Sequence, residues 1–347
     1  MLVKHAKEIA HDWVENVASQ FDEFSGAFIF GSVNWMDDND MFPHASDIDV
    51  RIVLDTNELP VGFKKVSYDK VLLDMSYVQL QQIKAVEDVL CDYATAAHFT
   101  RSCILSDPYH HLKRIKVGIE QEFAKHKWVQ ARVEAVEKWQ LDSLKQFLNK
   151  SDPFHDQVFA WIYATSMFAH MILVADLKNP TVRKCFVASR DVLNDYNQLA
   201  FHDELLGLIG STDLSGEQVQ SLLENCIEVF DTAKQVCKTE FFGSSTISDA
   251  GYPTAIGGID ELIQSGYHCE AVFWLVVIHT WCQKILYNDA SAETKARFMP
   301  RYQDLLATLG ISSFEKIYHR IEQVKLLREQ AIAITQHIMN HNSHIID

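Results

Sequence analysis

The sequence predicts an α+β protein, in which a small mixed sheet with flanking helices is followed by a larger all-helical region. Short apolar and β-branched runs bounded by turn residues, which are typical of strands, occur only before about Leu80. Beyond that point, apolar residues recur over long segments at the spacing of amphipathic helices. A length of 347 residues is also typical of about two domains. We expect these domains to span residues 1–108 and 109–347.

The first region is predicted to open with a helix and to continue into three strands. Apolar residues recur at helical spacing over residues 6–17. Residues 27–30 form a short apolar run that ends at Gly31-Ser32, which predicts a buried strand. A long acidic loop follows, and β-branched residues then predict a second strand at 47–54. A third strand is predicted at 71–78.

The second region is predicted to consist of long helices. The most apolar stretch, residues 158–175, is interrupted by Thr165, Ser166 and His170, so we expect a buried core helix rather than a membrane span. Its aromatic residues Trp161, Tyr163 and Phe168 are expected to belong to the core. The segments with helical periodicity are residues 115–148, 156–177, 215–238, 270–287 and 313–339.

The charge balance excludes one class of partner. Lys and Arg number 31 and Asp and Glu number 47, which gives a formal net charge of −16. A surface this acidic repels phosphate backbones, so we do not expect nucleic acid as a partner. The seven cysteines are scattered without a C-x-x-C spacing, and the charged N-terminal residues do not resemble a signal peptide. We therefore expect a cytoplasmic protein that does not bind a membrane.

Two carboxylates lie at the start of the second predicted strand. Side chains alternate between the faces of a strand, so Asp47 and Asp49 point to one side and Ile48 and Val50 to the other. Adjacent carboxylates repel each other unless a cation lies between them, and Mg²⁺ prefers oxygen ligands. Asp74 lies in the third predicted strand, where an acid among apolar residues is costly unless it is paired or metal-bound. Three such acids can hold two metal ions about 4 Å apart for phosphoryl or nucleotidyl transfer.

A phosphate cradle is predicted where the first strand ends. Glycine lets a phosphate approach the backbone closely, and the Ser32 hydroxyl would hold phosphate oxygens beside Gly31. A helix expected from about Val33 would add the positive end of its dipole. Asp69 competes with Asp74 as the third acid, although it lies in a turn-like stretch.

These motifs resemble those of the DNA polymerase β-type nucleotidyltransferase superfamily. The pattern is Gly31-Ser32 after a strand, Asp47-Ile48-Asp49 between apolar residues and Asp74 on a later strand. With the helical region that follows, residues 25–80 look most like bacterial aminoglycoside-type adenylyltransferases and their uncharacterised relatives. The resemblance implies a nucleotidyltransferase catalytic domain at 1–108, with a nucleotidyltransferase-type mixed sheet, and a helical substrate-binding domain at 109–347.

The resemblance also implies roles for individual residues. Asp47, Asp49 and Asp74 would be catalytic and would bind two Mg²⁺ ions, and Asp74 or another acid would be the general base. Gly31 and Ser32 would hold the phosphates of ATP or another nucleoside triphosphate.

The loop after Gly31-Ser32 departs from the family pattern. It lacks the Arg or Lys that many members carry there, and the gap to Asp47 is slightly longer than usual. Arg183 and Arg190 are seven residues apart, so on one helix they would share a face and reach the nucleotide phosphates. The other interpretation is a solvated helix whose basic residues pair with acids such as Asp191.

The function expected from these observations is transfer of a nucleoside monophosphate, AMP from ATP above all, to the hydroxyl of a small molecule. The acidic balance fits a cationic acceptor such as an aminoglycoside antibiotic, which would make the protein a resistance enzyme. The cleft between the two domains would bind both substrates. Two alternatives remain open: a nucleotidyltransferase that modifies a protein or RNA, and a non-catalytic scaffold that retains the fold.

Overall fold

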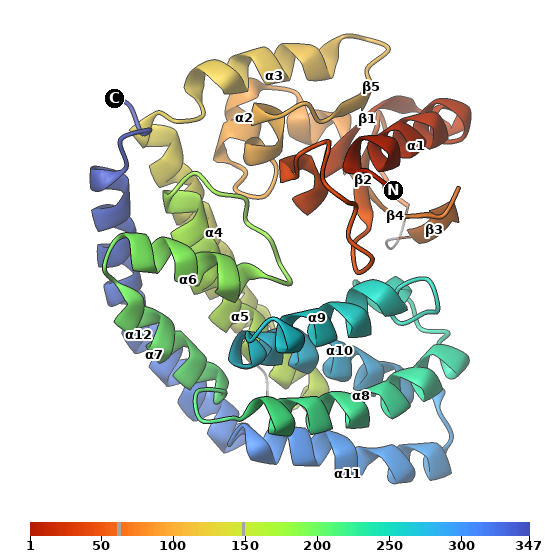
Figure 1. Cartoon of the computed structure of the whole chain (residues 1–347), viewed down its shortest axis with the longest axis vertical. Helices are drawn as coiled ribbons and strands as arrows, with labels where there is room; N and C mark the ends of the chain where they lie inside the picture. Colours follow the sequence, from red (N-terminus) through yellow and green to blue (C-terminus); the bar gives the residue numbers. More distant parts are fainter. Residues whose placement is uncertain (61–63, 148–149) are drawn as a thin grey trace.

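The computed structural model describes residues 1–60, 64–147 and 150–347. It is an α+β protein in which a small sheet unit lies beside a larger group of helices (Figure 1). The sheet unit contains the N-terminus, and the helices from α4 onward form the rest of the molecule. The coarse fold class predicted from the sequence is therefore confirmed.

The described residues form a five-stranded mixed sheet with the order β3-β4-β2-β1-β5. Strands β2 and β4 are parallel, and the other neighbouring pairs are antiparallel. The three predicted strands are confirmed as β1, β2 and β4, whereas the edge strands β3 and β5 were not predicted. The bounds are β1 (Phe24–Phe30), β2 (Ile48–Leu54), β3 (Lys64–Tyr68), β4 (Val71–Gln79) and β5 (Ile104–Ser106).

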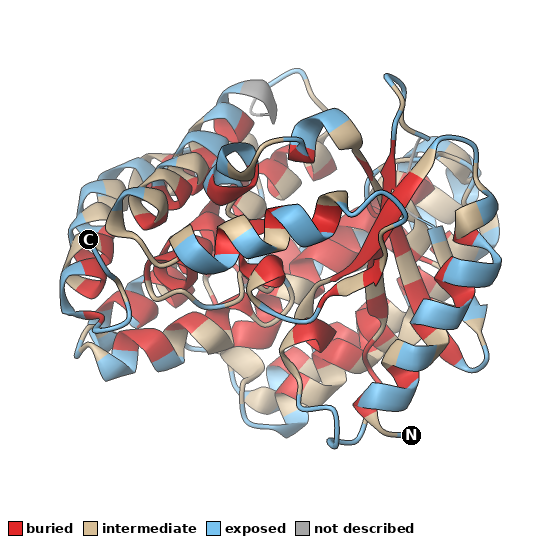
Figure 2. Ribbon diagram, turned by 90° about the horizontal axis from the view of Figure 1, so that it is seen from above, coloured by how far each residue is buried: buried red, intermediate tan, exposed pale blue. Residues whose placement is uncertain are grey.

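One face of the sheet carries the core of the first unit, and its strands are largely buried (Figure 2). Helix α1 (Val3–Asn16) packs on β2, β4 and β5 through apolar residues three or four positions apart, including Ala6, Ala10 and Trp13. The other α-helices of this unit are α2 (Val86–Cys91) and α3 (His111–Glu122), and its 3₁₀ turns are η1 (Ala18–Gln20), η2 (Ser32–Trp35), η3 (Leu80–Ile83) and η4 (Ala96–Thr100).

The second unit is built around two apolar helices, α5 (Phe154–Ala175) and α10 (His268–Asp289). Both are long and apolar enough to cross a membrane by length and composition alone. In the fold, 89% of the most apolar window of α5 and 83% of that of α10 are buried inside the protein, so the expectation of a core helix at 158–175 is confirmed. Trp161 and Phe168 lie in this core as predicted.

The remaining helices surround these two, and α12 follows α4 and α5 along one side (Figure 1). The predicted segment 115–148 is two helices, α3 and α4, and its last residue lies outside the described residues. The bounds are α4 (His126–Phe147), α6 (Cys185–Asp195), α7 (Leu199–Ile209), α8 (Gly216–Val236), α9 (Gly258–Gln264), α11 (Ala292–Thr308) and α12 (Phe314–His341), with a 3₁₀ turn η5 (Ser244–Thr246) and a π-helical turn η6 (Pro253–Gly257).

The two units have separate hydrophobic cores. The first runs from Val3 to Phe123 and the second from Val129 to Met339. Helix α3 packs in the first core, so the division falls after Phe123 rather than at residue 108. Arg132 of α4 lies at this junction, where its guanidinium donates hydrogen bonds to the carbonyl oxygens of Leu90 and Phe123.

Candidate functional site

The sheet register brings the predicted acids together. Asp49 of β2 pairs directly with Asp74 of the parallel strand β4, and Asp47 immediately precedes β2 on the same side. Ile48 and Leu73 point to the opposite face, where both are fully buried in the core. The alternation of apolar and acidic residues along β2 therefore packs one face of the sheet and leaves carboxylates on the other.

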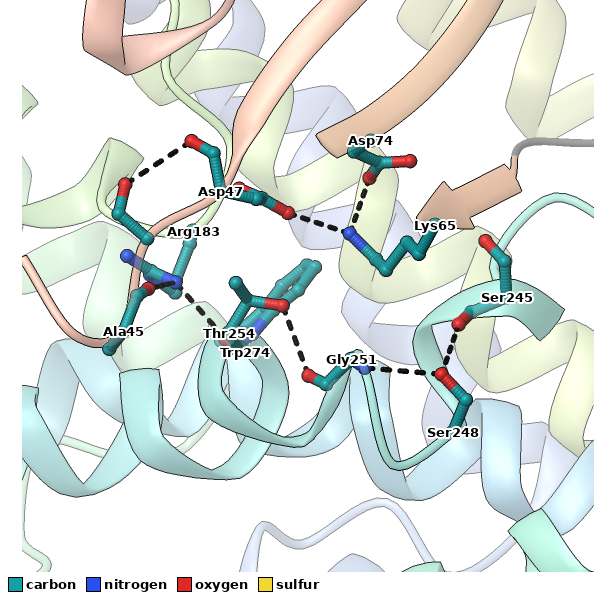
Figure 3. A network of polar contacts seen from close by, with 11 residues as sticks. Ala45, Asp47, Lys65, Asp74, Arg183, Ser245, Ser248, Gly251, Thr254 and Trp274 are labelled. Atoms are coloured by element: carbon teal, nitrogen blue, oxygen red, sulfur yellow. Dashed lines mark hydrogen bonds and ion pairs between the residues drawn. The ribbon is translucent and has the colours of Figure 1, made fainter. Parts of the chain in front are cut away.

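A lysine that sequence reasoning missed lies between these acids. Lys65 of β3 pairs in register with Asp74, and its Nζ lies 2.6 Å from Asp47 Oδ2 and 2.5 Å from Asp74 Oδ2 (Figure 3). The Lys65 side chain is only 4% exposed. The Asp47 and Asp74 carboxylates thus share one cation, and that cation belongs to the chain itself.

The buried acids have perturbed proton affinities. Burial, followed by repulsion from Asp47 and Asp74, raises the pKa of Asp49 well above its usual value. Burial also raises the pKa of Asp74, and the Lys65 ammonium offsets part of this rise. Burial by itself lowers the pKa of Lys65, but the Asp47 and Asp74 carboxylates outweigh it and raise that pKa above its usual value. Lys65 is therefore an ammonium ion at neutral pH.

Gly31 lies directly against the Asp49 carboxylate. Its φ of 97° falls in the left-handed region that favours glycine, and a Cβ at this position would overlap the Asp49 side chain. The Gly31 N–H donates a 3.3 Å hydrogen bond to Nε2 of His98. Ser32 follows at the mouth of the cleft, but it begins only the four-residue 3₁₀ turn η2. The α-helix expected from about Val33 is therefore not formed, and this short turn does not supply the dipole of an α-helix.

Two further side chains, His98 and Arg51, line the cleft together with Gly31 and Asp49. Burial, with a smaller effect from the nearby Arg51 cation, lowers the pKa of His98 to about 3, so its ring is neutral and accepts the Gly31 N–H. Arg51 lies two residues beyond Asp49 on the same face, stacks 3.8 Å from the centroid of the Phe30 ring and donates to Ser76 Oγ. The sequence prediction did not include either residue, although the alternation of β2 places Arg51 on the acidic face.

Asp69, the competing third acid, lies elsewhere. Asp69 and Lys70 both have positive φ and form the two-residue turn between β3 and β4. Asp69 is exposed in this turn, so Asp74 is the acid that faces Asp49.

The two predicted phosphate-binding arginines are separated. Arg183 precedes α6 and donates from Nη1 to the carbonyl oxygens of Ala45, at 2.8 Å, and Thr254, at 3.1 Å (Figure 3). Arg190 lies within α6, is ion-paired with Glu270 and does not line the cleft. The two therefore do not share one helix face. Arg183 holds the chain just before Asp47 against the helical unit, and the structure brings only Arg183 to the acids.

A cleft of about 370 Å³ joins these groups to the helical unit. Tyr163, which is predicted to belong to the core, packs against the core of the helical unit and also lines the cleft. His170 of α5 also lines it and is 97% buried. The aromatic side chains on the helical side are Tyr163, Phe242, Trp274 and Trp281.

The charges that line the cleft balance. Four acids face four cations, and the acid on the helical side, Glu261, is paired with Lys184 at 2.8 Å. The described lining therefore holds no unpaired carboxylate outside the cluster of Asp47, Asp49 and Asp74. The other lining cations are Arg51, Lys65 and Arg183.

The donor set at the cluster suits a hard divalent cation. As it stands, no group of three His, Cys, Asp or Glu side chains in the described parts of the chain is arranged to hold a metal ion, and Lys65 lies between two of the three acids. Oxygen ligands nevertheless remain: Asp74 Oδ1 is buried without a partner, and the Asp49 carboxylate makes no hydrogen bond to a described residue. Such oxygens match the preference of Mg²⁺.

No protein-family model matches the chain, and no curated protein matches it either.

Proposed function

We propose that the protein is a magnesium-dependent nucleotidyltransferase that moves a nucleoside monophosphate, AMP from ATP in the first instance, to the hydroxyl of a small molecule. The observation that carries the proposal is the direct pairing of Asp49 with Asp74 beside Asp47, opposite the close approach of Gly31. Converging carboxylates can hold the metal ions that metal-assisted nucleotidyl transfer requires.

The roles of the residues follow from their positions. Asp47, Asp49 and Asp74 would hold Mg²⁺, which supplies charge neutralisation at the α-phosphate and activation of the attacking hydroxyl. The Ser32 hydroxyl would bind phosphate oxygens beside the Gly31 turn, because Gly31 admits the phosphate without steric conflict. Arg51 supplies the positive charge that the loop after Ser32 lacks.

The reaction balances as an in-line displacement. The acceptor oxygen forms a bond to the α-phosphorus while the bond from that phosphorus to the pyrophosphate oxygen breaks. The hydroxyl proton passes to a carboxylate of the cluster, and we assign this role to Asp74 because its buried Oδ1 has no hydrogen-bond partner among the described residues.

The cleft lining bears on the acceptor. Its charges are balanced and its helical wall is aromatic, with Tyr163, Trp274 and Trp281. The negative charge of the whole chain is therefore not concentrated here, and the proposal requires a hydroxylated acceptor but not a cationic one.

The test is nucleotidyl transfer by the purified protein. Each α-³²P-labelled nucleoside triphosphate is incubated with Mg²⁺ and a panel of hydroxylated antibiotics, with and without amino groups, and labelled product and pyrophosphate are measured. Asp49→Asn should lower the rate at least about 100-fold, because it removes a carboxylate ligand of the proposed Mg²⁺ site. Asp55→Asn, an exposed acid just beyond β2, should leave the rate unchanged. Equal activity in Asp49→Asn and wild type would refute the proposal.

One observation favours a second candidate. Lys65 already pairs with Asp47 and Asp74, as it would in a scaffold that keeps the fold without catalysis. Such a protein would release no pyrophosphate with any acceptor, and its melting temperature would not shift with ATP and Mg²⁺ beyond controls. The transfer assay and a thermal shift with ATP and Mg²⁺ together separate the two candidates.

A further inference from the structure

The Lys65 ammonium lies where a second cation would be expected in a three-carboxylate site. It bridges Asp47 Oδ2 and Asp74 Oδ2 at 2.6 and 2.5 Å. Its side chain is 4% exposed, whereas each of the two acids is 18% exposed. The cation is thus less accessible to solvent than the carboxylates that it joins.

The hairpin of β3 and β4 fixes Lys65 in this position. Lys65 pairs directly with Asp74, and the two-residue turn at Asp69 and Lys70 fixes this register between β3 and β4. Lys64, the preceding residue on β3, alternates to the other side of the strand and is exposed. The register of β3 on β4 therefore directs the Lys65 side chain toward the three acids.

The oxygens that Lys65 does not contact include Asp74 Oδ1 and the Asp49 carboxylate. Asp49 makes no hydrogen bond with a described residue, and Asp74 Oδ1 is buried without a partner. Three carboxylates and one ammonium also leave a formal negative charge in the cluster, part of which the nearby Arg51 cation offsets. Both the ligand atoms and the charge of the cluster therefore favour an added cation.

We propose that Lys65 is a built-in cation that fills one of the two cation positions, so that the nucleotide-free protein binds one divalent ion, on the Asp49 side. The inference rests on the proposed function in taking the three acids as a metal site. It adds that Lys65 sets how many ions this site accepts before nucleotide arrives.

The test is a Mn²⁺ titration of the nucleotide-free protein, followed by electron paramagnetic resonance of free Mn²⁺. Wild type should bind one ion. Lys65→Met should bind two, because the oxygens of Asp47 and Asp74 become available to a metal. Lys64→Met removes the same charge from the same strand without touching the cluster, so it should bind one ion like wild type.

Stability in chelator gives a second readout. Without metal, Lys65→Met leaves three neighbouring carboxylates with no shared cation, so it should unfold at a lower temperature than Lys64→Met. Excess Mn²⁺ should remove most of that difference. If Lys65→Met does not fold, Lys65→Gln is used, because it keeps hydrogen-bond donors to the acids but lacks the charge.

The outcomes separate this inference from the proposed function. Two ions bound to wild type, or one ion bound to both wild type and Lys65→Met, would overturn the role of Lys65 and leave the metal site standing. No Mn²⁺ bound to any variant, with or without ATP, would overturn the metal site and the proposed function with it.

Discussion

Gly31 lies so close to Asp49 in the cleft that a methyl group on Gly31 would overlap the Asp49 carboxylate. The backbone of Gly31 is also in the left-handed region, with φ of 97°. The glycine is therefore required twice, once for its conformation and once for the space that the acid occupies. The contact joins the two motifs that the sequence offers separately, Gly31-Ser32 and Asp47-Ile48-Asp49.

Substitution of Gly31 by alanine should therefore lower the free energy of unfolding by more than the backbone strain alone would. Gly266 provides a matched control, since its φ is 84° and nothing lies within 4 Å of a Cβ there. Gly266→Ala should lower the free energy of unfolding by about 1–3 kcal/mol and leave nucleotidyl transfer intact. Gly31→Ala should lower it further and abolish transfer, because Asp49 must move. Urea unfolding and pyrophosphate release measure both effects. Equal losses in the two variants would mean that the contact with Asp49 is unimportant.

The pH dependence of stability should report the charge on Asp49. Burial, followed by repulsion from Asp47 and Asp74, raises the pKa of this carboxyl well above its usual value of 3.8. Between those two values the folded protein binds more protons than the unfolded chain, so the free energy of unfolding falls as the pH rises. In chelator, wild type should lose more stability than Asp49→Asn as the pH rises above about 4.

The two proteins share every other titrating group, so the difference between their curves isolates Asp49. Mg²⁺ should flatten the wild-type curve, because a bound cation favours the charged carboxylate. Parallel curves for wild type and Asp49→Asn in chelator would show that the pKa of Asp49 is not raised in the folded protein. Asp55→Asn should follow wild type throughout.

The strands that the sequence predicts are those whose side chains pack the core. Strands β1, β2 and β4 lie in the middle of the sheet, and their apolar residues form clear runs. Strands β3 and β5 lie at the edges and are five and three residues long. Their polar and apolar residues do not form a clear strand pattern, so they are recognised as strands only from their pairing with a neighbour. Edge position therefore explains why both were missed.

The same reason limits the prediction of the site. The acids Asp47, Asp49 and Asp74 could be found because carboxylates among apolar residues are conspicuous. Lys65 could not be found in this way, because its pairing with Asp74 is evident only once β3 is placed beside β4. The prediction of Arg190 depends on Arg183 lying on the same helix, whereas α6 begins only at Cys185.

Arg183 should act as a positioning residue for the acids. Its Nη1 donates to the carbonyl oxygens of Ala45, two residues before Asp47, and Thr254. Arg183→Ala should lower the free energy of unfolding by about 1.5–3 kcal/mol and slow transfer, and Arg183→Lys should recover part of both. Arg190→Ala makes the same change of charge outside the cleft and should leave transfer unchanged. An equal loss of transfer in Arg190→Ala would assign the phosphates to Arg190 instead.

Arg132 should be the most sensitive residue at the junction of the two cores. Its side chain is 1% exposed, donates to the carbonyl oxygens of Leu90 and Phe123 at 3.1 and 2.7 Å, and stacks over the Phe123 ring. Arg132→Met keeps much of the volume but leaves two buried carbonyls without a donor, so the free energy of unfolding should fall by more than about 2 kcal/mol. The free energy of unfolding should fall by less in Arg132→Lys, because its ammonium group can still donate to one of the two carbonyls.

Lys138 provides the control on the same helix. Its side chain is 79% exposed and pairs with Asp142, so Lys138→Met removes the same charge at a cost of about 0–1 kcal/mol. Urea unfolding followed by tryptophan fluorescence compares the three variants with wild type. If Arg132→Met were as stable as Lys138→Met, the two carbonyls would be satisfied without the guanidinium, and the junction would depend on apolar packing instead.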